Sequence, residues 1–114
     1  MNNKTTELKE INGGVSAEQI QIWKNTYGRV SEVRVNDSEV GECHIGYFKR
    51  PDMKTMQAAS AISKNNEMKG AEVMFDNCWL GGSSIMQSDA IIKMQGMSAI
   101  GSLFGTYTHS IKNL

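Results

Sequence analysis

The sequence has no excess of charge of either sign. Its 12 lysine and arginine residues balance its 12 aspartate and glutamate residues, so the formal net charge of the 114-residue chain is zero. Proteins that bind DNA or RNA use clustered lysine and arginine side chains to neutralise phosphates. The balanced charge therefore predicts a protein whose partner is not a nucleic acid.

Long apolar runs are also missing. A membrane-spanning helix needs about 18 consecutive apolar residues, and the sequence has no such run. The N-terminal sequence MNNKTTELKE lacks the apolar core of a secretory signal. These absences predict a cytoplasmic protein that has no membrane partner.

Cysteine and histidine are scarce, with two of each in the chain: Cys43, Cys78, His44 and His109. Their spacing lacks the paired ligands of a tetrahedral zinc site, and Cys43 and His44 would point to opposite faces of an expected strand. A cysteine nucleophile with His109 as its base has no local signature. Because the cytoplasm is reducing, we expect two free structural cysteines. Because the spacing and the local signatures are missing, we expect no metal, cofactor or catalytic residue.

The glycine pairs at residues 13–14 and 81–82 do not resemble phosphate-binding loops. Neither pair precedes the lysine and hydroxyl residue of a P-loop, and neither has G-x-G-x-x-G spacing. We interpret the first pair as part of a linker and the second as a helix stop. The scattered carboxylates, including Asp76 and Asp89, are expected to be solvated.

The hydrophobic pattern predicts a single domain. Residues 1–14 are polar and end in a glycine pair, a composition typical of a flexible leader. Residues 15–114 are enough for one modest core. We therefore expect an N-terminal leader followed by one folded unit.

The first half of this unit has local signals for a helix and a hairpin. Ser16 begins a capping box, which predicts a helix over residues 17–27. Residues 33–35 and 43–47 alternate as half-buried strands do, and residues 36–38 have turn chemistry between them. An isolated hairpin is marginally stable, so it must pack against helices or pair with another strand, including a strand from a second copy.

Pro51 marks a switch from strand to helix. Its fixed φ and missing N–H end a strand ladder and suit the first turn of a helix. We expect Arg50 and Pro51 to be structural residues at this junction, with Arg50 acting by capping or pairing. Apolar stripes then predict helices over residues 53–64 and 68–80, joined as a helical hairpin.

The last apolar stripe covers residues 91–104 and predicts a helix that is capped at residues 83–84 or 88–89. Gly96 and Gly101 interrupt this stripe, so the helix either packs closely against another element or is soft. The complete pattern predicts an α+β fold in which a small antiparallel hairpin packs with about four helices.

Methionine is the one anomaly in the composition, with eight residues. Its flexible, polarizable thioether either fills gaps in a core or lines a surface that adapts to different partners. For Met68 and Met74, which share a stripe with aromatic residues, we favour the core. For Met94 and Met97, the core and a partner-facing surface are equal alternatives.

Three motifs follow one another in the centre of the chain. The hairpin ends in YFKRP (residues 47–51), an alanine-containing helix includes MQAASAIS, and the next helix, EMKGAEVMFDNCWLGG, closes on CWLGG (residues 78–82). In this order of features the sequence resembles small tail assembly chaperones of tailed bacteriophages and prophages. The resemblance covers roughly residues 20–104.

This resemblance implies a non-catalytic, oligomeric protein that coats a hydrophobic tape-measure protein during tail construction and is displaced as tail-tube subunits polymerise. We expect the partner to contact Met94, Met97, Ile100 and Phe104 on the last helix. One alternative is a minor structural or head–tail completion protein of the virion. A second alternative is a small enzyme or a nucleic-acid-binding module.

Overall fold

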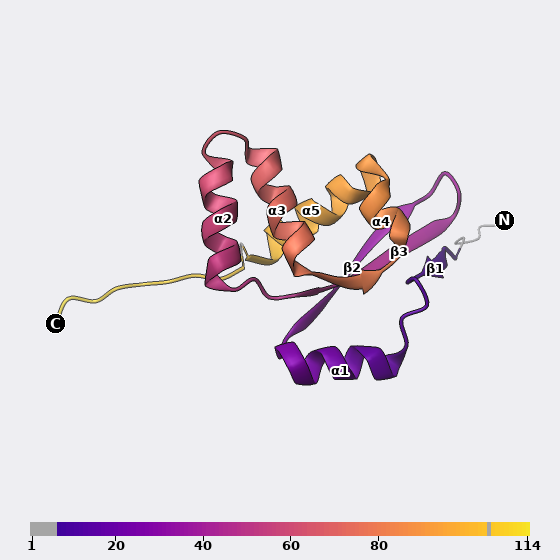
Figure 1. The fold of residues 1–114 in the computed structure, drawn as a ribbon, viewed down its shortest axis with the longest axis horizontal. Coiled ribbons are helices and arrows are strands. Elements are labelled where there is room, and N and C mark those ends of the chain that lie inside the picture. Colours follow the sequence, from indigo (N-terminus) through magenta and orange to yellow (C-terminus); the bar gives the residue numbers. More distant parts are fainter. Residues whose placement is uncertain (1–6, 105) are drawn as a thin grey trace.

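The computed structural model describes residues 7–104 and 106–114 and has the α+β fold that the sequence predicts. Helix α1 packs on one face of a sheet, and the other helices gather on the opposite side (Figure 1). In chain order the elements are β1 Lys9–Ile11, α1 Ala17–Tyr27, β2 Val30–Asp37, β3 Glu42–Lys49, α2 Met53–Ser63, α3 Glu67–Cys78, β4 Trp79–Gly82, α4 Ser84–Ser88 and α5 Ala90–Phe104.

Strand β3 is the centre of a four-stranded mixed sheet. Along one edge it pairs antiparallel with β2, which confirms the predicted hairpin. Along its other edge it pairs first with β1, which is parallel, and then with β4, which is antiparallel. The connecting turn lies at residues 38–41 rather than 36–38, because β2 continues to Asp37. The sheet is therefore larger than the predicted hairpin and is not purely antiparallel.

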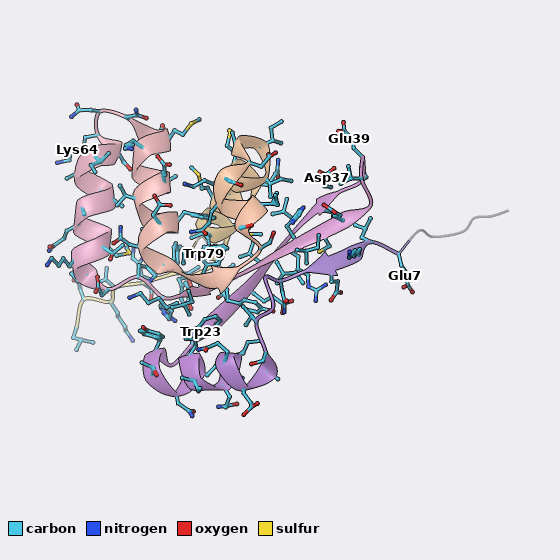
Figure 2. All side chains as sticks on the ribbon, turned by 45° about the vertical axis from the view of Figure 1, so that its right-hand side comes forward. Glu7, Trp23, Asp37, Glu39, Lys64 and Trp79 are labelled. Atoms are coloured by element: carbon cyan, nitrogen blue, oxygen red, sulfur yellow. The ribbon has the colours of Figure 1, made fainter. Side chains whose placement is uncertain are left out.

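Both faces of β3 are buried. Phe48 joins the main core, to which α3, α4 and α5 contribute, whereas Ile45 and Tyr47 face α1 in a second core. Figure 2 shows Trp23 of α1 and Trp79 of β4, which belong to the second and the main core respectively. The sequence predicted half-buried strands, but β3 is covered on both sides, and residues 43–48 are all buried as a result.

The helix predicted over residues 68–80 ends early. Helix α3 stops at Cys78, and Trp79 begins β4 with extended backbone (φ −62°, ψ 128°). Trp79 packs against the main core, while Leu80 packs against the second core on the α1 side. Side chains that alternate between faces are a property of strands, and a short apolar run does not distinguish a strand from a helix.

Gly81 and Gly82 belong to β4 and are not a helix stop. A Cβ atom on Gly81 would lie 2.8 Å from Cη2 of Trp23, and one on Gly82 would overlap the carbonyl oxygen of Ile45. Gly82 also has a φ of +144°, which side chains rarely adopt. These two positions need glycine because neighbouring elements approach the strand closely.

The leader predicted over residues 1–14 contains ordered structure. Residues 9–11 form β1, and Leu8 packs against the second core. Gly13 and Gly14 have φ values of +69° and +78°, so they make the left-handed turn that leads into α1. Residues 1–6 of the predicted leader lie outside the described residues.

Asp52, not Pro51, starts helix α2. Its side chain accepts a hydrogen bond from the backbone N–H of Thr55 at 2.8 Å, the geometry of an N-cap. Pro51 precedes this cap instead of occupying the first helical turn as predicted. Arg50 acts by pairing, since it donates a hydrogen bond to the Tyr107 hydroxyl at 2.9 Å.

One helix was predicted near the C-terminus, with its cap at residues 83–84 or at residues 88–89. The structure has a helix after each of these positions. Helix α4 follows Ser83, and α5 follows Asp89, whose Oδ1 accepts hydrogen bonds from the N–H groups of Ile91 and Ile92, both at 3.0 Å. Gly96 is packed closely, since a Cβ atom there would lie 3.0 Å from Cε2 of Phe75.

Candidate functional site

A groove of about 370 Å³ lies where α5 passes the hairpin of α2 and α3. All three helices contribute to it, and each supplies one methionine: Met56 from α2, Met74 from α3 and Met97 from α5. Alanine, glycine, Ile100 and Phe104 complete an apolar lining, and Ser60, Ser63 and Glu67 are its polar members. We call this feature the methionine groove.

Two glycines with different surroundings line the methionine groove. A Cβ atom on Gly70 of α3 would overlap Oγ of Ser63 and lie 2.8 Å from the carbonyl oxygen of Ala59, so α2 and α3 approach closely there. Gly101 of α5 is different, because a Cβ atom there would have no neighbouring atom within 4 Å. The space beside Gly101 is therefore free for a side chain from another molecule.

The three methionines connect the groove to both solvent and core. Met56 is 44% exposed, whereas Met74 and Met97 pack partly buried against the main core. A thioether side chain is flexible and polarizable, so it can rearrange around an entering apolar group with little strain. The methionine side chains can therefore change conformation, while the core residues beneath them stay in place.

Three of the four partner-contact residues expected from the sequence line this groove. Met97 and Phe104 are partly buried in its wall, and Ile100, which is 3% exposed, is part of its floor. Met94, one turn earlier on α5, does not line the groove and is 49% exposed. The structure therefore brings Met97, Ile100 and Phe104 together and leaves Met94 apart from them.

Sequence reasoning missed the contribution of α2 and α3 to this groove. Met56 and Met74 fall within the apolar stripes predicted over residues 53–64 and 68–80, but no local signal shows how a helical hairpin docks on a third helix. Met74 packs against the core as predicted. The same prediction is wrong for Met68, which is 57% exposed near the start of α3.

An ion-pair network joins α3 to α5 beside Phe75. Nζ of Lys93 lies 3.0 Å from Oε2 of Glu72 and 3.1 Å from Oδ1 of Asp76, and 5.3 Å from the centre of the Phe75 ring. Burial alone would lower the pKa of Lys93, but hydrogen bonds to the two carboxylates outweigh it and raise this pKa. Hydrogen bonds from Lys93 and then Lys69 lower the pKa of Glu72. Asp76, expected to be merely solvated, thus helps to hold the two helices together.

His44 contacts both Ser83 and Glu42, and these three residue types are also found in catalytic triads. Its Nδ1 lies 2.8 Å from Oγ of Ser83, and its Nε2 lies 3.2 Å from Oε1 of Glu42. These residue types also form hydrolytic triads, in which the serine must be open to substrate. Here His44 and Ser83 are each 1% exposed, and neither lines the methionine groove. The arrangement satisfies buried polar groups and presents no accessible nucleophile.

Both cysteines are free and buried, as predicted. Cys43 belongs to the second core and Cys78 to the main core, so they lie on opposite sides of the sheet. Burial raises the pKa of Cys78 to about 11, which keeps this thiol protonated near neutral pH. His109, proposed and rejected as a catalytic base, lies in the exposed segment after α5.

Within residues 7–104 and 106–114, no three histidine, cysteine, aspartate or glutamate residues are grouped so that they could hold a metal ion. None of the described helices combines the length and apolar character that crossing a membrane requires.

The methionine groove is thus an open depression in which apolar side chains from three helices meet. Comparisons of this chain with protein families, with curated proteins and with solved structures gave no match.

Proposed function

We propose that this protein is a non-catalytic phage tail assembly chaperone-like protein, which binds an apolar segment of a tape-measure protein, or of another tail protein, in the methionine groove. The observation that carries the proposal is the convergence of Met56, Met74 and Met97 from three helices on one open groove. Grooves of this kind receive the apolar face of an amphipathic helix, whose anchoring side chains recur every three or four residues.

The lining of the groove suits a client that offers many similar sites. Methionine side chains re-pack around anchors of different shape, so affinity does not depend on one exact sequence. The volume of about 370 Å³ holds a few anchoring side chains and not a whole helix. Each contact is therefore modest, and a coat of many copies can be displaced when tail-tube subunits polymerise.

The proposed role also defines where the protein acts and with what. It would work in the host bacterial cytoplasm as a homo-oligomer along its client, without a cofactor, a nucleic acid or a membrane partner. The balanced charge of 12 basic and 12 acidic residues supports the proposal that phosphates are not its target.

The test uses the free space beside Gly101. A Gly101→Trp variant would fill the groove with an indole, while Gly101→Ala adds one methyl group that meets no atom within 4 Å apart from its own turn of helix. When each variant is co-expressed with a tape-measure protein from the same genome, we expect the wild type and Gly101→Ala to co-purify with it. Gly101→Trp should lose the client while keeping the circular dichroism spectrum of the wild type.

Retention of the client by a folded Gly101→Trp variant would remove the groove from the proposal. Normal tails in a phage that lacks the gene would end the chaperone proposal altogether.

One observation favours a second candidate, a minor structural or head–tail completion protein of the virion. Residues 106–114 extend from the body without helix or strand, and extended arms often link neighbouring subunits of an assembly. Mass spectrometry of purified virions separates the two functions, because a virion component stays in the particle and a chaperone is absent from it.

A further inference from the structure

Strand β2 lies at an edge of the sheet, with β3 as its one hydrogen-bonded neighbour among the described strands. The direction of its backbone groups follows from β3. Ser83 N donates to the carbonyl oxygen of Ile45 at 2.8 Å, so the backbone groups of Ile45 point away from β2. Because these groups alternate along a strand, those of His44 and Gly46 point toward β2.

The partners of these two residues identify the free groups of β2. His44 is opposite Val35, and Gly46 is opposite Val33, so Val33 and Val35 use their N–H and C=O groups within the sheet. The N–H and C=O groups of Glu32, Arg34 and Asn36 therefore point outward from the edge. A row of such groups is a template on which another strand can pair.

A groove of about 610 Å³ runs between this edge and helix α5. We call it the edge groove. Its strand side consists of residues 34–39, and its helix side includes Ser98, Ala99 and Ser102. These small side chains leave room for an extended chain beside β2. Pairing with an edge strand while side chains contact an adjacent helix is an established mode of peptide recognition.

The edge groove is acidic at the end that lies near the hairpin turn. Asp37, Glu39 and Asp89 line it there, and Figure 2 shows Asp37 and Glu39 at the tip of the hairpin. The groove also includes Arg34, but this guanidinium lies 2.8 Å from a carboxylate oxygen of Glu10 and is also paired with Glu32. The charge at this end favours an extended segment that carries a basic side chain.

The chain itself contains such a segment. Residues 106–114, TYTHSIKNL, are rich in residues that favour strands, and residues 107–114 adopt neither helix nor strand. Ile111 is 93% exposed, and Lys112 next to it is exposed as well. The hydroxyl of Tyr107 accepts hydrogen bonds from Arg29 at 3.1 Å and Arg50 at 2.9 Å, so the segment is fixed at its start. Beyond this point it runs away from the body, on the side opposite the hairpin turn (Figure 1).

We infer that the protein self-associates by strand addition, in which residues 108–114 of one copy pair with the free edge of β2 in a second copy. At about 3.3 Å per residue this segment reaches about 23 Å, close to the roughly 26 Å length of β2. If it runs in the same direction as β2, the part of the segment that carries Lys112 lies toward the end of β2 where Asp37 and Glu39 of the acceptor are found. This inference does not rest on the proposed function.

The geometry also determines the type of assembly. The donor segment and the acceptor edge are different surfaces of the same molecule, so each copy can give one strand and receive another. Such head-to-tail contacts produce rings when the rotation closes and open filaments when it does not. Self-association should therefore continue beyond a dimer as the protein concentration rises.

The test is sedimentation equilibrium of the full chain over a range of concentrations. A variant with His109→Pro and Ser110→Pro lacks two adjacent N–H groups, one of which faces the acceptor edge in any register. The matched control carries alanine at both positions. We expect the wild type and the alanine control to associate equally, and the proline variant to associate at least about fivefold more weakly for each hydrogen bond lost.

Charge exchange tests the direction of the added strand. Glu39→Lys changes an exposed side chain of the acceptor copy, and Lys112→Glu changes the exposed side chain of the donor copy that would lie near it. Each single variant should associate more weakly than the wild type, and the double variant should recover. Recovery supports the parallel direction, whereas weakening without recovery would overturn that direction.

Hydrogen exchange identifies the acceptor. On association the amides of Glu32, Arg34 and Asn36 should become protected, while those of Val33 and Val35 are protected in the monomer as well. Three results would overturn the inference: a wild type that stays monomeric up to millimolar concentration, equal association of the proline variant and its control, or protection of the three edge amides at all dilutions. The last result would mean that the segment folds back on its own β2.

Discussion

Arg50 and Tyr107, separated by 57 positions, join the strand–helix junction to the segment after α5. Nη1 of Arg50 donates to the Tyr107 hydroxyl at 2.9 Å, and the guanidinium lies 5.1 Å from the centre of the ring. Arg29 donates to the same hydroxyl. The start of the segment after α5 is therefore held by the Tyr107 hydroxyl, which accepts hydrogen bonds from Arg29 and Arg50.

Replacing Tyr107 with phenylalanine should release this segment without unfolding the domain. The ring can still contact Arg50, but the oxygen that accepts both hydrogen bonds is gone. We expect amide exchange at Thr106 and Tyr107, whose N–H groups donate to Leu103 and Phe104, to accelerate. The free energy of unfolding should fall by less than about 1 kcal/mol because the contact is exposed. Thr108→Val is the matched control and should change neither. A large loss of global stability in Tyr107→Phe would instead make the contact part of the fold.

The glycines of the methionine groove should respond in opposite ways to alanine. Gly101→Ala should raise the free energy of unfolding by about 0.5–1 kcal/mol, since the new methyl group meets no atom and the helix gains a better former. Gly70→Ala should lower it by about 1–3 kcal/mol, because the methyl group would collide with Ser63 and the backbone of α2. Urea denaturation measures both. Equal effects at the two positions would contradict the close approach of α2 and α3.

The cap of α2 should depend on pH. The hydrogen bond from the backbone of Thr55 is the main cause that lowers the pKa of Asp52 below its ordinary value of 3.8. The folded state thus binds this proton less tightly than the unfolded state, so Asp52 stabilises the fold above pH 3.8 and loses this effect as the pH falls through its lower folded value. Thermal melts should show Asp52→Ala less stable than the wild type near neutral pH, with a difference that shrinks in acid. Asp52→Asn keeps a capping oxygen that does not titrate, so its stability should show no such dependence relative to Asp52→Ala.

Cys78 should make the fold sensitive to alkali. Burial raises its pKa from 9.0 to about 11, so the folded state holds this proton more tightly than the unfolded state. The resulting stabilisation is complete below pH 9 and is lost as the pH rises to about 11. The difference in unfolding free energy between the wild type and Cys78→Ala should therefore decrease over this interval in urea titrations. Native Cys78 should also react with thiol reagents far more slowly than the same residue in urea, and fast native labelling would contradict its burial.

Local signals in the sequence were sufficient to predict the elements that end in caps and turns. The helix over residues 17–27 and the hairpin of β2 and β3 were predicted because their side chains contact near neighbours in the chain. Strands β1 and β4 were missed for the opposite reason. Lys9–Ile11 and Trp79–Gly82 are short, and each pairs with a strand that lies more than thirty positions away, so no local pattern marks them.

The candidate site was predictable only in part. The apolar stripe of α5 identified Met97, Ile100 and Phe104, but it could not show which residues face the core and which face a partner. That distinction depends on how α5 docks against α2 and α3, which is set by contacts such as Gly70 with Ser63. The sequence predicts that the hairpin packs against helices or pairs with a further strand, but it does not show that the edge of β2 is the one left free.

The position of β3 has a consequence for synthesis of the protein. Half of one edge of this strand pairs with residues 9–11, which are synthesised before β3, and the other half pairs with residues 79–82, which are synthesised much later. A nascent chain that ends before Trp79 thus carries a hydrophobic strand with half of one side bare, the form most prone to pairing with a neighbouring chain. Once Gly82 has emerged, β4 can close that gap, and the main core is completed when α4 and α5 follow.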